Sequence, residues 1–373
     1  MVVIDVSADL AHLDQSLEQL PNLPAVFLLW PERGAPYLAR TALLRRRLSR
    51  LMGRRDRPSR LLNLREVVRR IEYQITASKL ESAVRLYELA RAHFPDSYSE
   101  IVKLRMPPYV KVVLQNDYPR TQITTHIART HAFYYGPFRS RASAERFESQ
   151  FLDLFQIRRC QEDLIPSPNH PGCIYGEMGM CLRPCQQVVG PDEYAHEVSR
   201  VVEFLSTDGK SLLDPVASSR DRLSEEMRFE EAARQHKRFE KIQEVLKARD
   251  DLARDLDKLN GVAITASAET GAIELWIVAN GWWQDSRRFR FEMPDGQPVS
   301  LDRRLRDLFE KLELRRSDHR ERQEYLALLA RWYYSSWRDG EWLDFEDFGH
   351  LPYRRLVNAI SRVARQETTE PEP

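Results

Sequence analysis

The sequence of 373 residues lacks several features that would place it in a familiar class. No apolar run approaches the roughly eighteen residues needed to cross a membrane, so we expect no membrane association. The N-terminus, MVVIDVSADLAHLDQ, has early acids and no basic region, which excludes a secretory signal. No internal repeat is visible. We therefore expect a cytoplasmic protein of two or three domains.

Cysteine is almost absent, and all of it lies in one stretch of 26 residues. The four thiols are separated by gaps of twelve, seven and three residues: Cys160, Cys173, Cys181 and Cys185. Clustered thiols in a cytosolic protein indicate metal binding more than disulfides. The tight C-x2-C pairs of structural zinc sites are missing, and wide gaps favour an iron–sulfur cluster. Cluster, zinc ion and plain packing thiols remain the three interpretations.

Excess charge is also missing, because the formal net charge is only +1, yet the charges are unevenly distributed. Residues 40–70 contain twelve arginines and only two acids, Asp56 and Glu66. Guanidinium groups match phosphate oxygens, so this block predicts nucleic-acid binding. The alternative is a solvated helix face balanced by acids elsewhere. No Ser/His/Asp or Cys/His nucleophile pattern is visible.

Hydrophobic periodicity predicts a mixture of short strands and helices. Strands are expected at 24–30, 37–39, 67–75, 261–267, 272–281 and 286–292. Helices are expected at 39–52, 78–94, 221–259, 301–314, 324–337 and 352–365. The fold class is therefore α+β.

The order of hairpin, arginine-rich helix, strand and helix resembles the GIY-YIG nuclease domain that opens UvrC. UvrC is the incision subunit of the bacterial UvrABC excision-repair nuclease. PAVF (24–27), YLART (37–41) and LLRRR (43–47) stand where the family has P-G-V-Y, Y-I-G-K-A and N-L-R-x-R. More specific matches are PPYVKVVLQNDYPR (107–120), YYGPF (134–138), FQIRRC (155–160) and PCQQVVGPDEYAHEV (184–198). The resemblance runs from about residue 20 to about 290.

This resemblance implies ligands and partners. UvrC-like proteins are thought to carry a [4Fe–4S] cluster on the positions of the four cysteines, with zinc as our alternative. The DNA-binding residues would be Arg40, Arg45, Arg46, Arg47 and Arg50. MRFEEAA (227–233) resembles the UVR motif, with which UvrC grips a hairpin of the helicase subunit UvrB. The partner-binding residues would then be Met227, Phe229, Glu230, Ala232 and Ala233, although an ordinary helical hairpin would show the same pattern.

The catalytic pattern of the GIY-YIG family is incomplete. The second-strand tyrosine and the helix arginine are retained as Tyr37 and Arg47, but Phe27 replaces the first-strand tyrosine. Leu86 stands at the metal-binding glutamate, and Tyr98 at the asparagine. A leucine cannot ligate a hard cation, so no divalent catalytic metal is expected. The RNase H-like nuclease domain of UvrC has no counterpart after residue 292.

We therefore expect a UvrC-like nucleotide excision repair protein that binds DNA and a UvrB-type partner without cleaving. One alternative is an active structure-specific endonuclease that uses Tyr37, Arg47 and a displaced carboxylate, for which Glu81 and Glu88 are candidates. Another is a protein-interaction module that does not bind nucleic acid.

The expected organisation has six segments. They are a degenerate GIY-YIG-like domain (20–100), a cysteine-rich region (101–215), a UVR-like helical hairpin (216–260), antiparallel strands (261–300), C-terminal helices (301–365) and a disordered tail (366–373).

Overall fold

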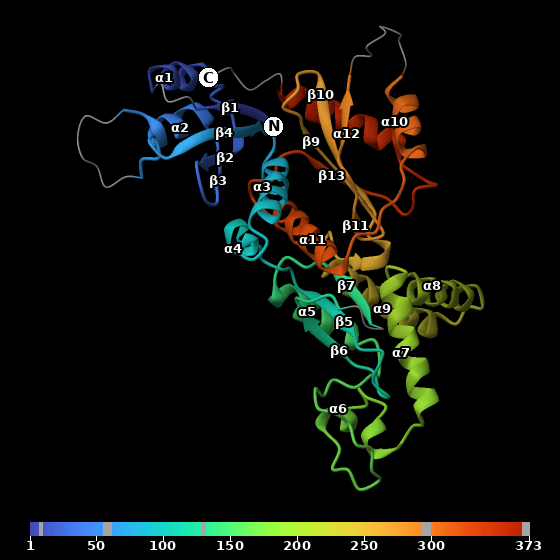
Figure 1. Cartoon of the computed structure of the whole chain (residues 1–373). Helices are drawn as coiled ribbons and strands as arrows, with labels where there is room; N and C mark the ends of the chain where they lie inside the picture. Colours follow the sequence, from blue (N-terminus) through green and yellow to red (C-terminus); the bar gives the residue numbers. More distant parts are fainter. Residues whose placement is uncertain (7–9, 55–61, 129–131, 292–299, 368–373) are drawn as a thin grey trace.

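The computed structural model describes residues 1–6, 10–54, 62–128, 132–291 and 300–367. Three antiparallel sheets and the helices around them make this part of the chain an α+β protein, which confirms the predicted fold class (Figure 1). None of the described helices is both long and apolar enough to cross a membrane.

The N-terminal sheet has the strand order β1-β4-β2-β3. Its strands are β1 (Val2–Asp5), β2 (Ala25–Pro31), β3 (Tyr37–Thr41) and β4 (Val68–Ile75). Successive side chains of β2 point to opposite faces. Phe27 packs with α1 (Leu10–Gln19) and α2 (Leu44–Met52), whereas Val26 packs with α3 (Lys79–His93). Strand β1 and helix α1 were not predicted.

Helix α2 begins at Leu44, five residues later than predicted. The prediction failed because β3 pairs with β2 as far as Thr41, opposite Ala25. The Thr41 hydroxyl then accepts the backbone N–H of Leu43 at 3.2 Å, which turns the chain into the helix. Helix α3 follows the prediction: Ser78 caps it, and the side chain of Glu81 accepts the N–H of Ala77.

The second sheet has the order β6-β5-β7-β8 and supports the middle of the chain. Its strands are β5 (Tyr109–Val112), β6 (Thr121–Thr124), β7 (Phe133–Gly136) and β8 (Arg254–Asp255). Helices α5 (Arg141–Leu152) and α7 (Pro191–Ser206) pack on it through an aromatic-rich core. Between them the chain forms the loop of the four cysteines, with the short helix α6 (Ile174–Glu177) and a 3-10 turn at Pro184–Gln186.

Helices α8 (Lys210–Glu225) and α9 (Phe229–Lys247) form a hairpin (Figure 1). The prediction of one helical pattern through residue 259 was wrong. The Asp250 carboxylate instead accepts the N–H of Arg139 and the hydroxyl of Ser143 at the start of α5. The chain then joins the second sheet as β8 and places Leu252 and Leu256 in a different core.

The third sheet has the order β11-β10-β9-β13, with β12 also paired to β10. Its strands are β9 (Gly261–Ala266), β10 (Ala272–Ala279), β11 (Trp282–Trp283), β12 (Arg287–Arg290) and β13 (Glu341–Asp344). Helices α10 (Leu301–Glu310) and α12 (Tyr353–Glu367) pack against it. The prediction of helices alone after residue 300 missed β13, which pairs with β9. A Cβ at Gly261 would overlap the ring of Trp342, so this pairing requires glycine.

Helix α11 (His319–Tyr333) lies against α3 and the short helix α4 (Tyr98–Val102) (Figure 1). Residues of α3, α4, β10 and α11 share one apolar core. At its centre, the Glu324 carboxylate accepts the hydroxyls of Tyr87 at 2.7 Å and Tyr98 at 2.6 Å. Arg320 donates to the same carboxylate at 3.1 Å. The tail was expected from residue 366, but α12 includes residues 366 and 367; residues 368–373 lie outside the described residues.

We predict that Glu324→Leu lowers the free energy of unfolding by roughly 2–5 kcal/mol, because two buried tyrosine hydroxyls lose their acceptor. Tyr98→Phe removes one hydroxyl and leaves the carboxylate with its other donors, so it should cost less. Urea denaturation followed by tryptophan fluorescence measures both. Equal midpoints for wild type and Glu324→Leu would contradict the prediction.

Candidate nucleic-acid interface and cysteine lobe

Helix α2 separates its leucines from its arginines. Leu44, Leu48, Leu51 and Met52 are buried against the N-terminal sheet. The intervening arginines therefore face outward, and Arg46 and Arg50 are exposed. Thr41 to Leu43, Arg46, Arg47 and Arg50 line a shallow cavity of about 240 Å³ on this face. We call these cavity-lining residues the α2 face.

Other arginines of the block hold the fold together. Arg65 is buried and donates to both carboxylate oxygens of Asp14, at 2.6 and 3.0 Å, and to the Met52 carbonyl. The Nε of Arg45 donates to the Leu20 carbonyl at 2.6 Å, so part of this predicted DNA contact is structural. The block thus divides into exposed and structural members. Arg55, Arg57 and Arg60 lie outside the described residues.

Two positions of the GIY-YIG pattern come together. The guanidinium of Arg47 donates to the hydroxyl of Tyr37 at 3.2 Å. The ring of Phe27 lies 6.2 Å from that of Tyr37, where it presents hydrocarbon and no hydroxyl. Leu86 belongs instead to the core shared by α3 and α11, a different cluster from that of Phe27. The structure therefore does not bring Leu86 into one group with Tyr37 and Arg47.

The nearby carboxylates are already engaged. Glu81 is buried at the start of α3, and burial raises its pKa. Glu88 pairs with Arg85 at 2.7 Å. Tyr98, at the asparagine position of the pattern, donates to Glu324. Sequence reasoning missed Glu324; its signal was an acid at the head of an otherwise apolar run, EYLALLA, which indicates a buried partner.

The cysteine lobe, residues 156–189, is attached to the second sheet by polar contacts. Arg158 donates through its backbone to the Tyr194 hydroxyl and through its side chain to the carbonyls of Tyr118 and Glu162. Leu182 N–H donates to the Gln156 carbonyl at 2.9 Å. In the described chain, residues 158–181 add no side chain to any of the four apolar cores. Apolar burial therefore contributes little to the order of this segment.

The lobe gathers its four thiols. Cys181 and Cys185 are buried, Cys160 is half-buried and Cys173 is exposed. Burial raises the pKa of Cys181 to about 11, and the three neighbouring thiols shift it in the same direction. Arg158 donates to the Cys160 sulfur at 3.5 Å, and the Arg183 N–H to the Cys181 sulfur at 3.4 Å. Four thiols are chemically suitable ligands for a thiolate-bound metal ion or iron–sulfur cluster. Within the described residues, however, no three His, Cys, Asp or Glu side chains are arranged to hold a metal ion.

The predicted partner-binding residues lie around the turn of the α8–α9 hairpin. Met227 has a φ of 58°, in the left-handed region, and its side chain is 78% exposed. Phe229 is 66% exposed, and Glu230 and Ala233 are also exposed. Ala232 is buried between the two helices, so it serves the hairpin itself. Two large apolar side chains thus stand in solvent at one turn.

Comparisons with known proteins agree with this architecture. Residues 108–204 match a family model described as UvrC/Cho excinuclease, middle domain. The chain is 23% identical to UvrABC system protein C of Lachnospira eligens over 295 residues, 78% of this chain and 48% of the relative. It is 26% identical to that of Desulfatibacillum aliphaticivorans over 308 residues, 81% and 50% respectively. The Moorella thermoacetica protein is 27% identical over 258 residues, 69% and 42%.

The middle of the chain is thus similar to the middle domain of UvrC/Cho excinucleases. The resemblance to UvrC predicted from the sequence is confirmed. The chain spans about half the length of the curated relatives it matches. No solved structure matches it.

Proposed function

We propose that this protein is a DNA-binding subunit of nucleotide excision repair that also binds a UvrB-type partner and does not cleave DNA. The observation that carries the proposal is a contrast within the N-terminal domain. The α2 face presents exposed guanidinium groups, whereas Phe27 and Leu86 fill two positions of the nuclease pattern with buried hydrocarbon. The likeness to proteins named UvrABC system protein C supplies the repair context.

Loss of the nuclease follows from the chemistry that these positions would need. Phosphoryl transfer requires an activated water, a metal on the phosphate oxygens and a cation to offset charge, all held together. Arg47 and Tyr37 supply the cation and one hydroxyl. Hard cations need oxygen ligands, and Leu86 has none. Of the two displaced carboxylates, Glu81 accepts the N–H of Ala77 and Glu88 pairs with Arg85.

Binding to phosphates should depend on the outer arginines of α2. We predict that Arg46→Ala with Arg50→Ala weakens duplex DNA binding evenly across sequences and lowers the salt slope by about 2, since each removes one phosphate contact. Fluorescence anisotropy at several salt concentrations measures this. The matched control is Arg303→Ala with Arg316→Ala, which removes two exposed charges from the C-terminal half.

The same DNA should stay uncut in Mg²⁺ or Mn²⁺. An unchanged affinity in the Arg46/Arg50 variant would contradict the DNA interface. The endonuclease alternative is favoured by the contact between Tyr37 and Arg47. It would be established if the protein nicks DNA in a metal-dependent reaction that Arg47→Ala abolishes.

The hairpin turn is the proposed site for the UvrB-type partner. Exposed Met227 and Phe229 would bury apolar surface on a matching helical hairpin, while Glu230 and Ala233 flank them. We predict that Phe229→Ala weakens binding to the C-terminal hairpin of a UvrB protein by at least about tenfold, the effect of a buried aromatic anchor. Calorimetry measures it, with exposed Leu314→Ala as the control. Equal affinities for the two variants would remove the hairpin from the interface.

We further propose that Cys160, Cys173, Cys181 and Cys185 hold a [4Fe–4S] cluster. The support is the gathered thiols, the two N–H···S hydrogen bonds and a segment that no apolar core orders. A bound cluster would cross-link the lobe, because ligation free energy is also folding free energy. Hydrogen bonds from Arg158 and Arg183 to the sulfurs would then stabilise the thiolate form.

Anaerobically purified protein should contain iron and acid-labile sulfide in equal amounts and absorb broadly in the visible range. Cys173→Ser should bleach it and make residues 158–181 sensitive to protease. Met178→Ala, an exposed change in the same lobe, should keep its colour. If the protein contains zinc and no sulfide, the cysteines bind a zinc ion and the cluster is excluded. Metal-free protein with a protease-resistant lobe would contradict both.

A further inference from the structure

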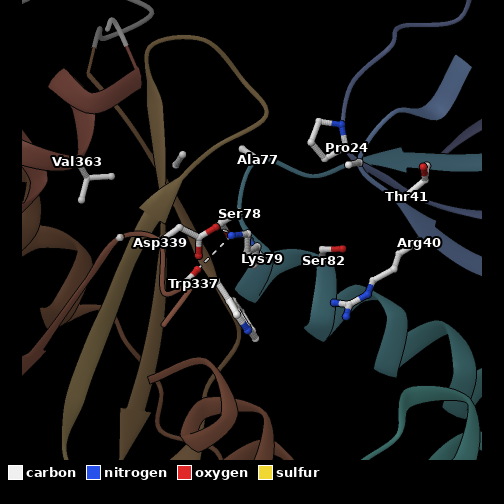
Figure 2. Close-up of a pocket in the computed structure, with 13 residues that line it drawn as sticks. Pro24, Arg40, Thr41, Ala77, Ser78, Lys79, Ser82, Trp337, Asp339 and Val363 are labelled. Carbon is white, nitrogen blue, oxygen red and sulfur yellow. Dashed lines mark hydrogen bonds between the residues drawn. The ribbon is translucent and has the colours of Figure 1, made fainter. Parts of the chain in front are cut away.

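A cavity of about 600 Å³ lies between the N-terminal domain and the C-terminal part of the chain (Figure 2). One wall comes from the end of β3 and the start of α3, and the other from β9, α12 and the turn before β13. Its volume is in the range of small-molecule sites. Residues from the C-terminal wall, such as Trp337 and Asp339, lie after the part of the sequence that resembles UvrC.

The charged groups of the cavity favour an anion. Arg40 and Lys79 supply two cations, and Asp339 is the only acid among the residues that line it. That acid is already engaged, since it accepts the Lys79 backbone N–H at 2.6 Å and the indole N–H of Trp332 at 2.9 Å. Figure 2 shows the contact between Lys79 and Asp339. The cavity lining is therefore net positive and favours a negatively charged ligand.

Arg40, an exposed residue on the rim of the N-terminal sheet, is a cation of the cavity that has no protein partner among the described residues. No hydrogen bond or ion pair joins its side chain to any residue that the structure describes. Burial and, secondarily, the charge of Arg331 lower its pKa. A bound anion would counter the repulsion from Arg331. Ser82, which also lines the cavity, offers a hydroxyl donor.

Trp337 gives the cavity an aromatic wall. Its indole is half-buried, and the Lys79 ammonium stands 5.6 Å from the ring centroid. The same ammonium donates to the Trp337 carbonyl at 3.3 Å, which fixes the cation beside the ring. Ala77, Pro24 and Val363 add apolar surface. A nucleotide matches this lining, because its base can stack on Trp337 and its phosphate can bind the cations.

The cavity also continues into the α2 face. Thr41 and Ala42 line both this cavity and the shallow one formed by Arg46, Arg47 and Arg50. A DNA strand held by its phosphates along α2 would therefore reach the cavity with its next nucleotide.

We infer that this cavity binds an unpaired nucleotide, with its phosphate between Arg40 and Lys79 and its base against Trp337. The inference rests on the proposed function, since the α2 face would hold the rest of the strand. It makes the C-terminal turn at residues 337–340 part of the DNA site and gives the protein a preference for gapped or single-stranded DNA over intact duplex.

The test compares the full-length protein with Arg40→Ala and Trp337→Leu on duplex DNA with a short gap and on the intact duplex. Each change should weaken binding to gapped DNA by about 5- to 100-fold, the range for loss of one stacked base. For Trp337→Leu, which removes no charge, binding to intact duplex should change less than about twofold. Trp337→Phe retains a ring and should keep most of the preference; Arg33→Ala removes an exposed charge outside the cavity and should change nothing. Thermal melting checks that the variants fold.

A second arm uses deoxynucleoside monophosphates as competitors. Competition that Trp337→Leu abolishes supports the cavity and shows that it takes free nucleotides as well as a strand. If Arg40→Ala and Trp337→Leu bind gapped DNA like wild type, while the Arg46/Arg50 variant loses duplex binding, the cavity is excluded and the proposed function stands. If wild type binds neither DNA nor mononucleotide, both fail.

Discussion

The Glu324 carboxylate joins parts of the chain that are far apart in the sequence. It lies 237 residues after Tyr87 and 226 after Tyr98, and it accepts both hydroxyls in a core that excludes water. A buried carboxylate is stable only when its oxygens are satisfied, so α3, α4 and α11 must keep one fixed arrangement. The apolar contacts around it, from Leu80 on α3 to Trp332 on α11, depend on the same arrangement. The N-terminal domain is thus completed by the C-terminal part.

This arrangement also determines the surroundings of Leu86. The helix face that a metal site would need is instead part of an interior core, and Leu86 suits that environment better than a carboxylate would. On the other side of the sheet, α2 keeps its outward arginines. One face of the sheet is therefore packed against the C-terminal part of the chain, and the other presents arginines to solvent.

Local features of the fold could be predicted from the sequence, and distant pairings could not. The β2–β3 hairpin and helix α3 follow from short-range signals, such as the Ser78 cap. Leucines continue at helical spacing after Lys247, so nothing local announced that Leu252 and Leu256 leave the helix. Strand β13 was missed because its partner, β9, lies about eighty residues earlier.

The candidate site shows the same limit. The arginine block was visible as a composition, yet sequence alone cannot separate buried Arg65 from exposed Arg46, since only the fold brings Asp14 to one and solvent to the other. The family pattern pointed to Tyr37 and Arg47 as residues, and the structure adds the hydrogen bond between them. The wall formed by Trp337 was not, because it belongs to a segment outside that pattern.

The shared core has a consequence for synthesis on the ribosome. Chains emerge at roughly 5–20 residues per second, so Glu324 follows Tyr87 by roughly 10–50 s. During that interval the apolar side of α3 has no α11 to cover it. Leu80 and Val84 therefore lack their α11 contacts until that helix has been synthesised. The core shared by α3, α4 and α11 can be completed only after residue 333 has been added to the chain.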